Sequence, residues 1–259
     1  MLHSMSTPHD AQGDGAQGDE AQAVPQAQHP HKPHDAAFAT RLNWLRAGVL
    51  GANDGIVSIA GIVVGVAGAT TDRTAILIAG VAGVVAGAMS MAVGEYVSVS
   101  TQRDSEKAML ALERRELHEM PAEELDELTA LYVDKGIEPA LAREVAEQLT
   151  AKDALRAHAD IELGIDPDEL ANPWHAAGAS FVSFLVGALL PMIAILLPGP
   201  SWQVPVTFVA VLVALALTGR ISARLGQAPS LPAVRRNMVG GALAMALTYA
   251  IGTAVGVGV

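Results

Sequence analysis

Five long apolar stretches alternate with polar segments along the chain. Each holds roughly 20 mostly apolar residues, which is the length that an α-helix needs to cross a bilayer. They cover residues 47–69, 75–98, 175–197, 203–219 and 237–259. Pro191 lies inside the third stretch and predicts a kink, which neighbouring helices can accommodate. The pattern predicts an all-α membrane protein with five transmembrane helices.

The long polar segment between the second and third stretches predicts three further helical pieces. No glycine or proline interrupts the chain between Ser98 and Pro121, so the second membrane helix should continue into this segment. A second helix should run from Pro121 to Gly136, and a third should stop at Gly164. We therefore expect a small antiparallel three-helix domain, inserted between the second and third membrane helices.

The segment before the first apolar stretch has no apolar periodicity. It contains the near-repeat AQGDGAQGDEAQ, a composition typical of disorder. Its HPHKPH stretch carries His29, His31 and His34, which either collect metal or are passive. The sequence thus divides into a disordered His-containing tail (1–40), the first two membrane helices (41–100), an acidic metal-binding helical domain (101–173) and the last three membrane helices (174–259).

The charge of the chain is concentrated in the inserted domain. The protein has 259 residues and a formal net charge of −11. Residues 101–174 contain 19 Asp and Glu against 8 Lys and Arg, and so account for the whole imbalance. An acidic surface disfavours nucleic acid and favours cations as partners. The absence of cysteine excludes disulfides and thiolate sites, and no nucleophile or phosphate loop indicates an enzyme.

Basic residues predict the orientation in the membrane. The short connections 70–74 and 198–202 carry one arginine between them, whereas the 220–236 connection carries four. By the positive-inside rule, the N-terminus, the acidic domain and the 220–236 connection face the cytoplasm. The alanine- and arginine-rich composition without a eukaryotic sorting signal favours a bacterial plasma membrane.

Two carboxylates remain inside the predicted spans, Asp54 and Glu95. A charge near the bilayer centre costs at least about 2.5 kcal/mol, and no Lys or Arg of the predicted spans is available as a partner. Glu95 lies close enough to the cytoplasmic end to be simply hydrated. Asp54 lies deeper, at a depth similar to that of Met91 on the second helix. A carboxylate and a thioether there suit one divalent transition metal, although a membrane methionine is also an ordinary packing residue.

Glycines in the first two spans recur every four residues. Gly61 and Gly65 do so in the first span, and Gly83 and Gly87 lead to Met91 and Glu95 in the second. Small residues at this spacing let helix backbones approach closely. The stripes predict tight packing, either within one bundle or between two copies of the chain.

Acidic side chains of the inserted domain recur at helical spacing. The pairs are Glu113 with Glu116, Glu124 with Glu127, and His158 with Glu162. Each pair projects from one helix face, where like charges destabilise an isolated helix unless a cation compensates. Carboxylates with one imidazole suit Fe²⁺ or Mn²⁺, and the alternative is a solvated acidic face. A ferritin-like di-iron site is disfavoured, because no histidine here follows a glutamate by three residues.

Several motifs resemble the vacuolar iron transporter family over about residues 41–258. They are WLRAGVLGANDGIVS at 44–58, GAMSMAVGEYVSVSTQRD at 87–104, DALRAHADIELGI at 153–165 and TYAIG at 248–252. The resemblance implies a homodimer with a translocation path along the subunit interface. It also implies export of cytosolic Fe²⁺, and often Mn²⁺, in exchange for protons.

The resemblance assigns roles to particular residues. Asp54 and Met91 match the membrane metal path of the family. The cytoplasmic metal-binding glutamates are matched by Glu113, Glu116, Glu124, Glu127 and Glu162, with Glu123 as an alternative to Glu124. His158 and Ala159 take the place of methionines in a plant member. The resulting metal set is Asp54, Met91, Glu95, Glu113, Glu116, Glu124, Glu127, His158 and Glu162.

The sequence thus predicts a divalent-metal transporter without a prosthetic group, with lipid, metal ions, protons and a second copy of the chain as partners. The competing hypothesis is a membrane-anchored metal-binding or sensing protein without transport. That protein would need the glutamates, but it would have no use for Asp54 inside its anchor.

Overall fold

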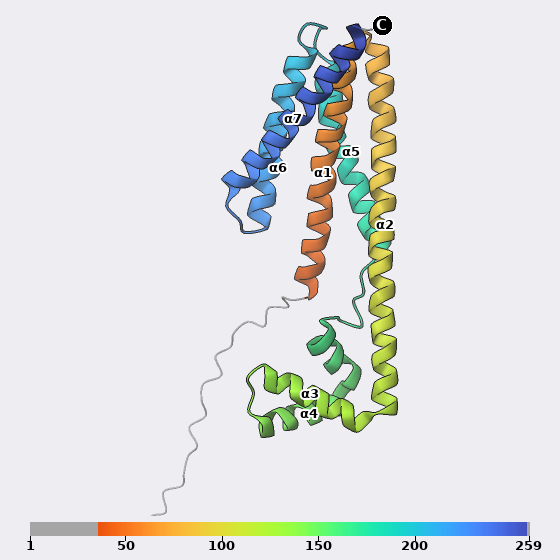
Figure 1. The fold of residues 1–259 in the computed structure, drawn as a ribbon, viewed down its shortest axis with the longest axis vertical. Coiled ribbons are helices and arrows are strands. Elements are labelled where there is room, and N and C mark those ends of the chain that lie inside the picture. The colour runs from red at the N-terminus through yellow and green to blue at the C-terminus, as the bar shows by residue number, and fades with distance from the viewer. Residues whose placement is uncertain (1–35, 258–259) are drawn as a thin grey trace, which may run out of the picture. The chain divides into compact units, whose positions relative to one another are not determined.

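The computed structural model describes residues 36–257, which fold into helices joined by short connections (Figure 1). The predicted His-containing tail lies almost wholly outside this range. The helices are α1 (Ala36–Ala69), α2 (Arg73–Glu119), α3 (Pro121–Asp134), α4 (Pro139–His158), the π-helical turn η1 (Ala159–Leu163), α5 (Pro173–Leu196), α6 (Gln203–Leu225) and α7 (Ser230–Val257). The predicted all-α class is confirmed.

Five of the described helices are long and apolar enough to cross a membrane. They are Gly48–Ala69 of α1, α2, α5, α6 and Ser230–Gly256 of α7, and each overlaps one predicted span. Between α2 and α5 lies the shorter helical section of α3 and α4. The predicted arrangement of five spans with a helical insert is therefore confirmed.

The connection between α6 and α7 is much shorter than the sequence pattern predicted. α6 continues to Leu225 and α7 begins at Ser230, so a four-residue turn replaces the predicted 220–236 loop. Pro232 lies in the first turn of α7, where a backbone N–H has no intrahelical partner and its loss costs nothing. Consequently Arg235 and Arg236 belong to a helix that is apolar enough to span a membrane.

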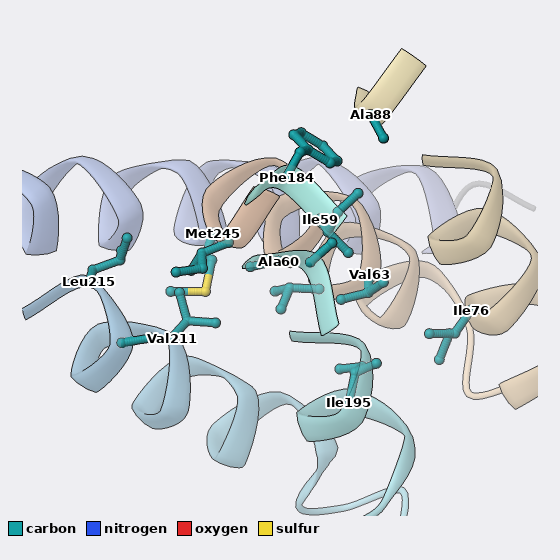
Figure 2. Close-up of a cluster of buried hydrophobic side chains, with 14 residues drawn as sticks. Ile59, Ala60, Val63, Ile76, Ala88, Phe184, Ile195, Val211, Leu215 and Met245 are labelled. Carbon is teal, nitrogen blue, oxygen red and sulfur yellow. The ribbon is translucent and has the colours of Figure 1, made fainter. Parts of the chain in front are cut away.

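Helix α1 forms the centre of the membrane bundle. It packs against α2, α5, α6 and α7, and its Ile59, Ala60 and Val63 are fully buried. Figure 2 shows these side chains surrounded by buried residues of the other four helices. Within residues 36–257, α2 and α7 make no contact with each other, so both flank α1 without meeting.

Glycines on α1 permit this close packing. A Cβ at Gly51 would lie 2.9 Å from the Ser180 carbonyl oxygen of α5, and one at Gly68 would lie 2.7 Å from the Tyr249 carbonyl oxygen of α7. On α2, a Cβ at Gly87 would overlap the Phe184 ring. Gly61 and Gly65 face Thr248 of α7, and Gly83 faces Ile59 and Ile62. The stripes are thus used for packing within the bundle of one chain.

Helix α2 is too long to lie wholly in a bilayer. Its 47 residues extend for about 70 Å, more than twice the hydrocarbon thickness of about 30 Å. The second half therefore leaves the membrane as one continuous helix, as the sequence predicted, and ends at Glu119. Pro121 then starts α3. Helices α3 and α4 and the π-helical turn η1 all contact α2.

Candidate metal centre

Four predicted ligands from four different elements meet in the helical section outside the membrane bundle. Glu113 comes from α2, Glu124 from α3, His158 from α4 and Glu162 from η1. The Nδ1 atom of His158 lies 3.0 Å from Oε1 of Glu113, 3.6 Å from Oε2 of Glu124 and 3.8 Å from Oε2 of Glu162. We call these four residues the glutamate–histidine cluster.

Three of the four side chains are removed from solvent. His158 is 0% exposed, Glu113 3% and Glu124 5%, whereas Glu162 remains partly open to solvent. Carboxylates are rarely buried without a partner, since dehydration of the charge is costly. The cluster is therefore an enclosed group of carboxylates around one imidazole, with Glu162 at its open side.

A break in α4 directs His158 and Glu162 toward the cluster. Asp153 has non-helical backbone angles (φ −168°, ψ 92°), and its Oδ1 accepts a hydrogen bond from the Arg156 N–H at 3.1 Å. The side chain thereby caps the helical turns that follow it. The next turn is π-helical and ends at Gly164, whose φ of 64° suits glycine. This local geometry places Glu162 over His158.

Buried atoms of the cluster lack hydrogen bonds. Within the described residues, neither ring nitrogen of His158 forms a hydrogen bond, and Oε1 of Glu113 accepts none. This holds although Nδ1 and Oε1 are only 3.0 Å apart. Buried polar atoms are normally paired, so these atoms call for a further partner. Ligand atoms of Glu113, His158 and Glu162 all lie within 4.8 Å of one another, which is close enough to share one ion. Oxygen and imidazole ligands fit first-row divalent metals.

The electrostatics of the cluster also favour a cation. Burial and, after it, the charges of the neighbouring carboxylates, Glu162 foremost, together raise the pKa of Glu113 to about 7. Burial and then the charge of Glu127 raise the pKa of Glu124. Both groups belong to the part of the chain outside the bundle. A divalent ion would compensate the negative charges that disfavour ionisation of these two carboxyls.

The remaining predicted glutamates lie at the edge of the cluster. Glu116 is half-buried and Glu127 is exposed, yet both charges raise the pKa of Glu113. Glu123 is exposed, whereas Glu124 faces His158, so the geometry favours Glu124 of the two alternatives.

Arginines of this section pair with other carboxylates. Arg143 contacts Asp126 and Glu147, and Arg156 contacts Asp166 and Asp168. Among the described residues, no Lys or Arg forms an ion pair with a carboxylate of the glutamate–histidine cluster. Arg143 and Arg156 are therefore engaged elsewhere and do not pair with the charges of the cluster.

The two predicted membrane ligands share a cavity of about 450 Å³ within the bundle. Asp54 of α1 and Met91 of α2 both line it, consistent with their predicted match in depth. Ser58 donates a hydrogen bond to Oδ1 of Asp54 at 2.8 Å. Glu95 is half-buried and is not among the residues that line this cavity.

One charged residue of the cavity was missed by the sequence pattern. Arg236 of α7 lines it together with Asp54, on a helix that begins at Ser230 and not at the predicted residue 237. The error arose because four arginines were assigned to a loop. Ser230 followed by Pro232 is a helix-start signal that could have placed Arg236 on a helix.

The comparison with known families identifies the family of this chain. Residues 45–253 match the model of the VIT family. The chain belongs to the VIT family. This confirms the resemblance drawn from the GANDGIVS and SMAVGEYVSV motifs, and the match covers both the membrane bundle and the glutamate–histidine cluster.

Relatives of this VIT-family chain have similar lengths. A protein of Acanthamoeba castellanii named vacuolar iron transporter is 45% identical over 226 residues, which cover 85% of this chain and 81% of that protein. Vacuolar iron transporter homolog 1 of Oryza sativa is 35% identical, covering 90% of this chain and 83% of the relative. Vacuolar iron transporter homolog 2.1 of Arabidopsis thaliana is 34% identical, covering 83% and 82%. These names are those of transporters, which confirms that the chain is not an enzyme.

Proposed function

We propose that this VIT-family protein transports Fe²⁺ across a membrane, with Mn²⁺ as a second substrate. The observation that carries the proposal is the open cavity formed by α1, α2 and α7, which both Asp54 and Met91 line. Iron accepts both oxygen and sulfur ligands, whereas alkali cations have little use for sulfur. The names of the relatives support iron as the substrate.

Outside the bundle, the glutamate–histidine cluster collects the metal. Its enclosed imidazole and carboxylates have no basic partner among the described residues, and their geometry suits one divalent ion. Glu116 and Glu127 at the edge attract the ion electrostatically, and Glu95 lies on α2 between this section and Met91. His29, His31 and His34 of the tail are outside the described residues.

We assign the direction of transport from the distribution of charge. The positive-inside rule puts the α6–α7 turn and the glutamate–histidine cluster on the cytoplasmic side of a bacterial plasma membrane, so the metal leaves the cytosol. Protons from the other side compensate the movement, because a protonated Asp54 is a poor ligand and releases its ion.

A second copy of the chain completes the path in this proposal. The cavity lies between α2 and α7, which do not contact each other in one chain. One face of α2 also carries an exposed apolar row at helical spacing, consisting of Val81, Val85, Met89, Val93 and Val97. A homodimer would cover such a row, and lipid would cover it in a monomer. Cross-linking through Val93→Cys in the otherwise cysteine-free chain distinguishes the homodimer from the monomer, because only a homodimer covers the row with a second copy.

A flux assay tests the proposal. Purified protein in liposomes should carry Fe²⁺ and Mn²⁺ faster than Zn²⁺, and a proton gradient should accelerate both. Asp54→Ala should abolish flux, while a metal-binding or sensing protein would bind metal and show no flux at all. Unchanged flux in Asp54→Ala would remove the transport role of Asp54.

A further inference from the structure

Arg236 occupies a position that the transport proposal does not explain. It lines the cavity of Asp54 and Met91, on a helix that is apolar enough to span a membrane. Neither α6 nor α7 contains an acidic residue, and Arg236 forms no ion pair within residues 36–257. A charge in such a helix is costly and usually faces a polar path or an opposite charge. The nearest candidate of opposite charge on the cavity wall is Asp54.

Hydrogen bonds fix the two charged residues on opposite walls. Asn237 Nδ2 donates to Asn53 Oδ1 at 3.3 Å, and Thr218 Oγ1 donates to the same oxygen at 3.4 Å. Asn53 precedes Asp54, and Asn237 follows Arg236, so α7 cannot slide along α1 without breaking the bond between Asn237 and Asn53. The bond between Asn237 and Asn53 thus holds the neighbouring residues Arg236 and Asp54 at the wall of one cavity.

Arg236 is an exposed residue at the wall of the cavity. Arg236 and Asp54 line the same space without forming an ion pair within 4.0 Å. A Cβ at Gly240, one turn along α7, would meet nothing within 4 Å. The only hydrogen bond to the Asp54 side chain among the described residues comes from Ser58. The carboxylate oxygens of Asp54 therefore remain available to a cation, which can be a basic side chain of the protein or a metal ion.

We propose that Arg236 is the tethered counter-cation of Asp54, which offsets the charge of the carboxylate across the shared cavity and competes with a divalent metal for it. The inference rests on the proposed role of Asp54 in transport. Guanidinium and metal compete for one carboxylate, so Arg236 weakens metal binding and speeds release. Because arginine stays protonated at all physiological pH values, the guanidinium is available to the Asp54 carboxylate whenever that carboxylate is ionised.

The absence of cysteine gives a direct test of the coupling between the two positions. In Asp54→Cys, iodoacetamide reacts with the thiolate, and a nearby arginine increases the thiolate fraction. At one near-neutral pH, we expect alkylation of Asp54→Cys to slow about threefold or more when Arg236→Gln is added. Adding Arg236→Lys should preserve the rate. The matched control is Arg235→Gln. Consecutive side chains on a helix point in different directions, so the Arg235 side chain points away from that of Arg236.

Alkylation that slows no more with Arg236→Gln than with Arg235→Gln overturns the proposal. A transport measurement with Asp54 intact provides the second arm. In liposomes, Arg236→Gln should lower the half-saturating Mn²⁺ concentration about threefold and also lower the maximal flux, and Arg236→Lys should restore both. An unchanged half-saturating concentration overturns the proposal even if the maximal flux falls.

The two arms separate this proposal from the one on which it rests. Unchanged flux in Asp54→Asn would overturn the transport role of Asp54, and with it the competition between Arg236 and metal. Lost flux in Asp54→Asn with no effect of Arg236→Gln in either assay would leave transport intact and overturn the counter-cation alone.

Discussion

The Nδ1 atom of His158 lies 3.0 Å from Oε1 of Glu113, and both atoms are buried without a hydrogen bond in the described part of the chain. An imidazole and a carboxylate at this distance would normally share a proton along a well-directed bond. Here the same Nδ1 atom also lies 3.6 Å from Oε2 of Glu124 and 3.8 Å from Oε2 of Glu162. We propose that the two atoms are ligands of one ion rather than an isolated pair, and the first predictions test this.

Removal of the imidazole should weaken metal binding. In His158→Ala, the carboxylates lose the one neutral ligand of the cluster, and we expect the Mn²⁺ affinity of the purified protein to fall about tenfold or more, which is about 1.4 kcal/mol. Titration calorimetry measures the change. The matched control is His118→Ala, because His118 is an exposed histidine near the end of α2. Equal affinities in the two variants would exclude His158 as a ligand.

The raised pKa of Glu113 predicts a pH-dependent local stability in metal-free protein. The group titrates near 4.5 when unfolded and at about 7 when folded, so the folded state holds the proton more tightly. The resulting stabilisation is fully present below pH 4.5 and is lost as the pH rises through 7. We expect hydrogen exchange in α3 and α4 to be slower at pH 5 than at pH 8 once the intrinsic rate is corrected. Glu113→Gln should remove most of this difference.

Metal binding should show the opposite dependence on pH. An ion binds the deprotonated carboxyl, so its affinity should rise about tenfold per pH unit below 7 for each proton released and level off above it. Titrations in two buffers of different ionisation enthalpy count the protons. If the affinity of the wild-type protein were constant from pH 5 to 8, the ion would not be replacing a proton on Glu113.

The close approach of α1 and α5 should be sensitive to a single methyl group. A Cβ at Gly55 would overlap the Phe184 carbonyl and lie 3.0 Å from the Ala188 nitrogen, both of which are backbone atoms that cannot turn aside. We expect Gly55→Ala to destabilise the bundle by about 1–3 kcal/mol, seen as a lower melting temperature in detergent. Gly94→Ala is the control, since nothing lies within 4 Å of its Cβ position. The control should be neutral or slightly stabilising, because alanine favours a helix.

Apolar periodicity was sufficient to predict much of the fold. The five spans follow from runs of roughly 20 apolar residues, and the continuation of α2 to Glu119 follows from the absence of Gly and Pro after Ser98. The boundary of α7 was wrong because charged residues were taken as evidence for a loop. Arginines at the end of a membrane helix are compatible with helical structure, so charge alone does not mark the helix end.

The glutamate–histidine cluster could be predicted only in part. The i, i+4 spacing placed His158 and Glu162 on one face of one helix, but Glu113 and Glu124 reach them through contacts between α2, α3 and α4. Such contacts depend on how helices pack, and spacing within one helix carries no information on them. Spacing also left Glu123 and Glu124 equivalent, whereas burial separates them. The break at Asp153 has no sequence signal of its own, since aspartate is also tolerated within a helix.

That break supplies the last prediction. Asp153 is exposed and touches no ligand, but its carboxylate caps the turns that carry His158 and Glu162. Asp153→Ala removes the acceptor, and the cap is worth about 1 kcal/mol. We expect the Mn²⁺ affinity to fall severalfold while the number of bound ions stays the same, because every ligand is still present. Asp153→Asn keeps an oxygen acceptor without the charge and should restore the affinity. If Asp153→Asn were instead as weak as Asp153→Ala, the charge of Asp153 would be what matters, and its role would be electrostatic rather than one of positioning.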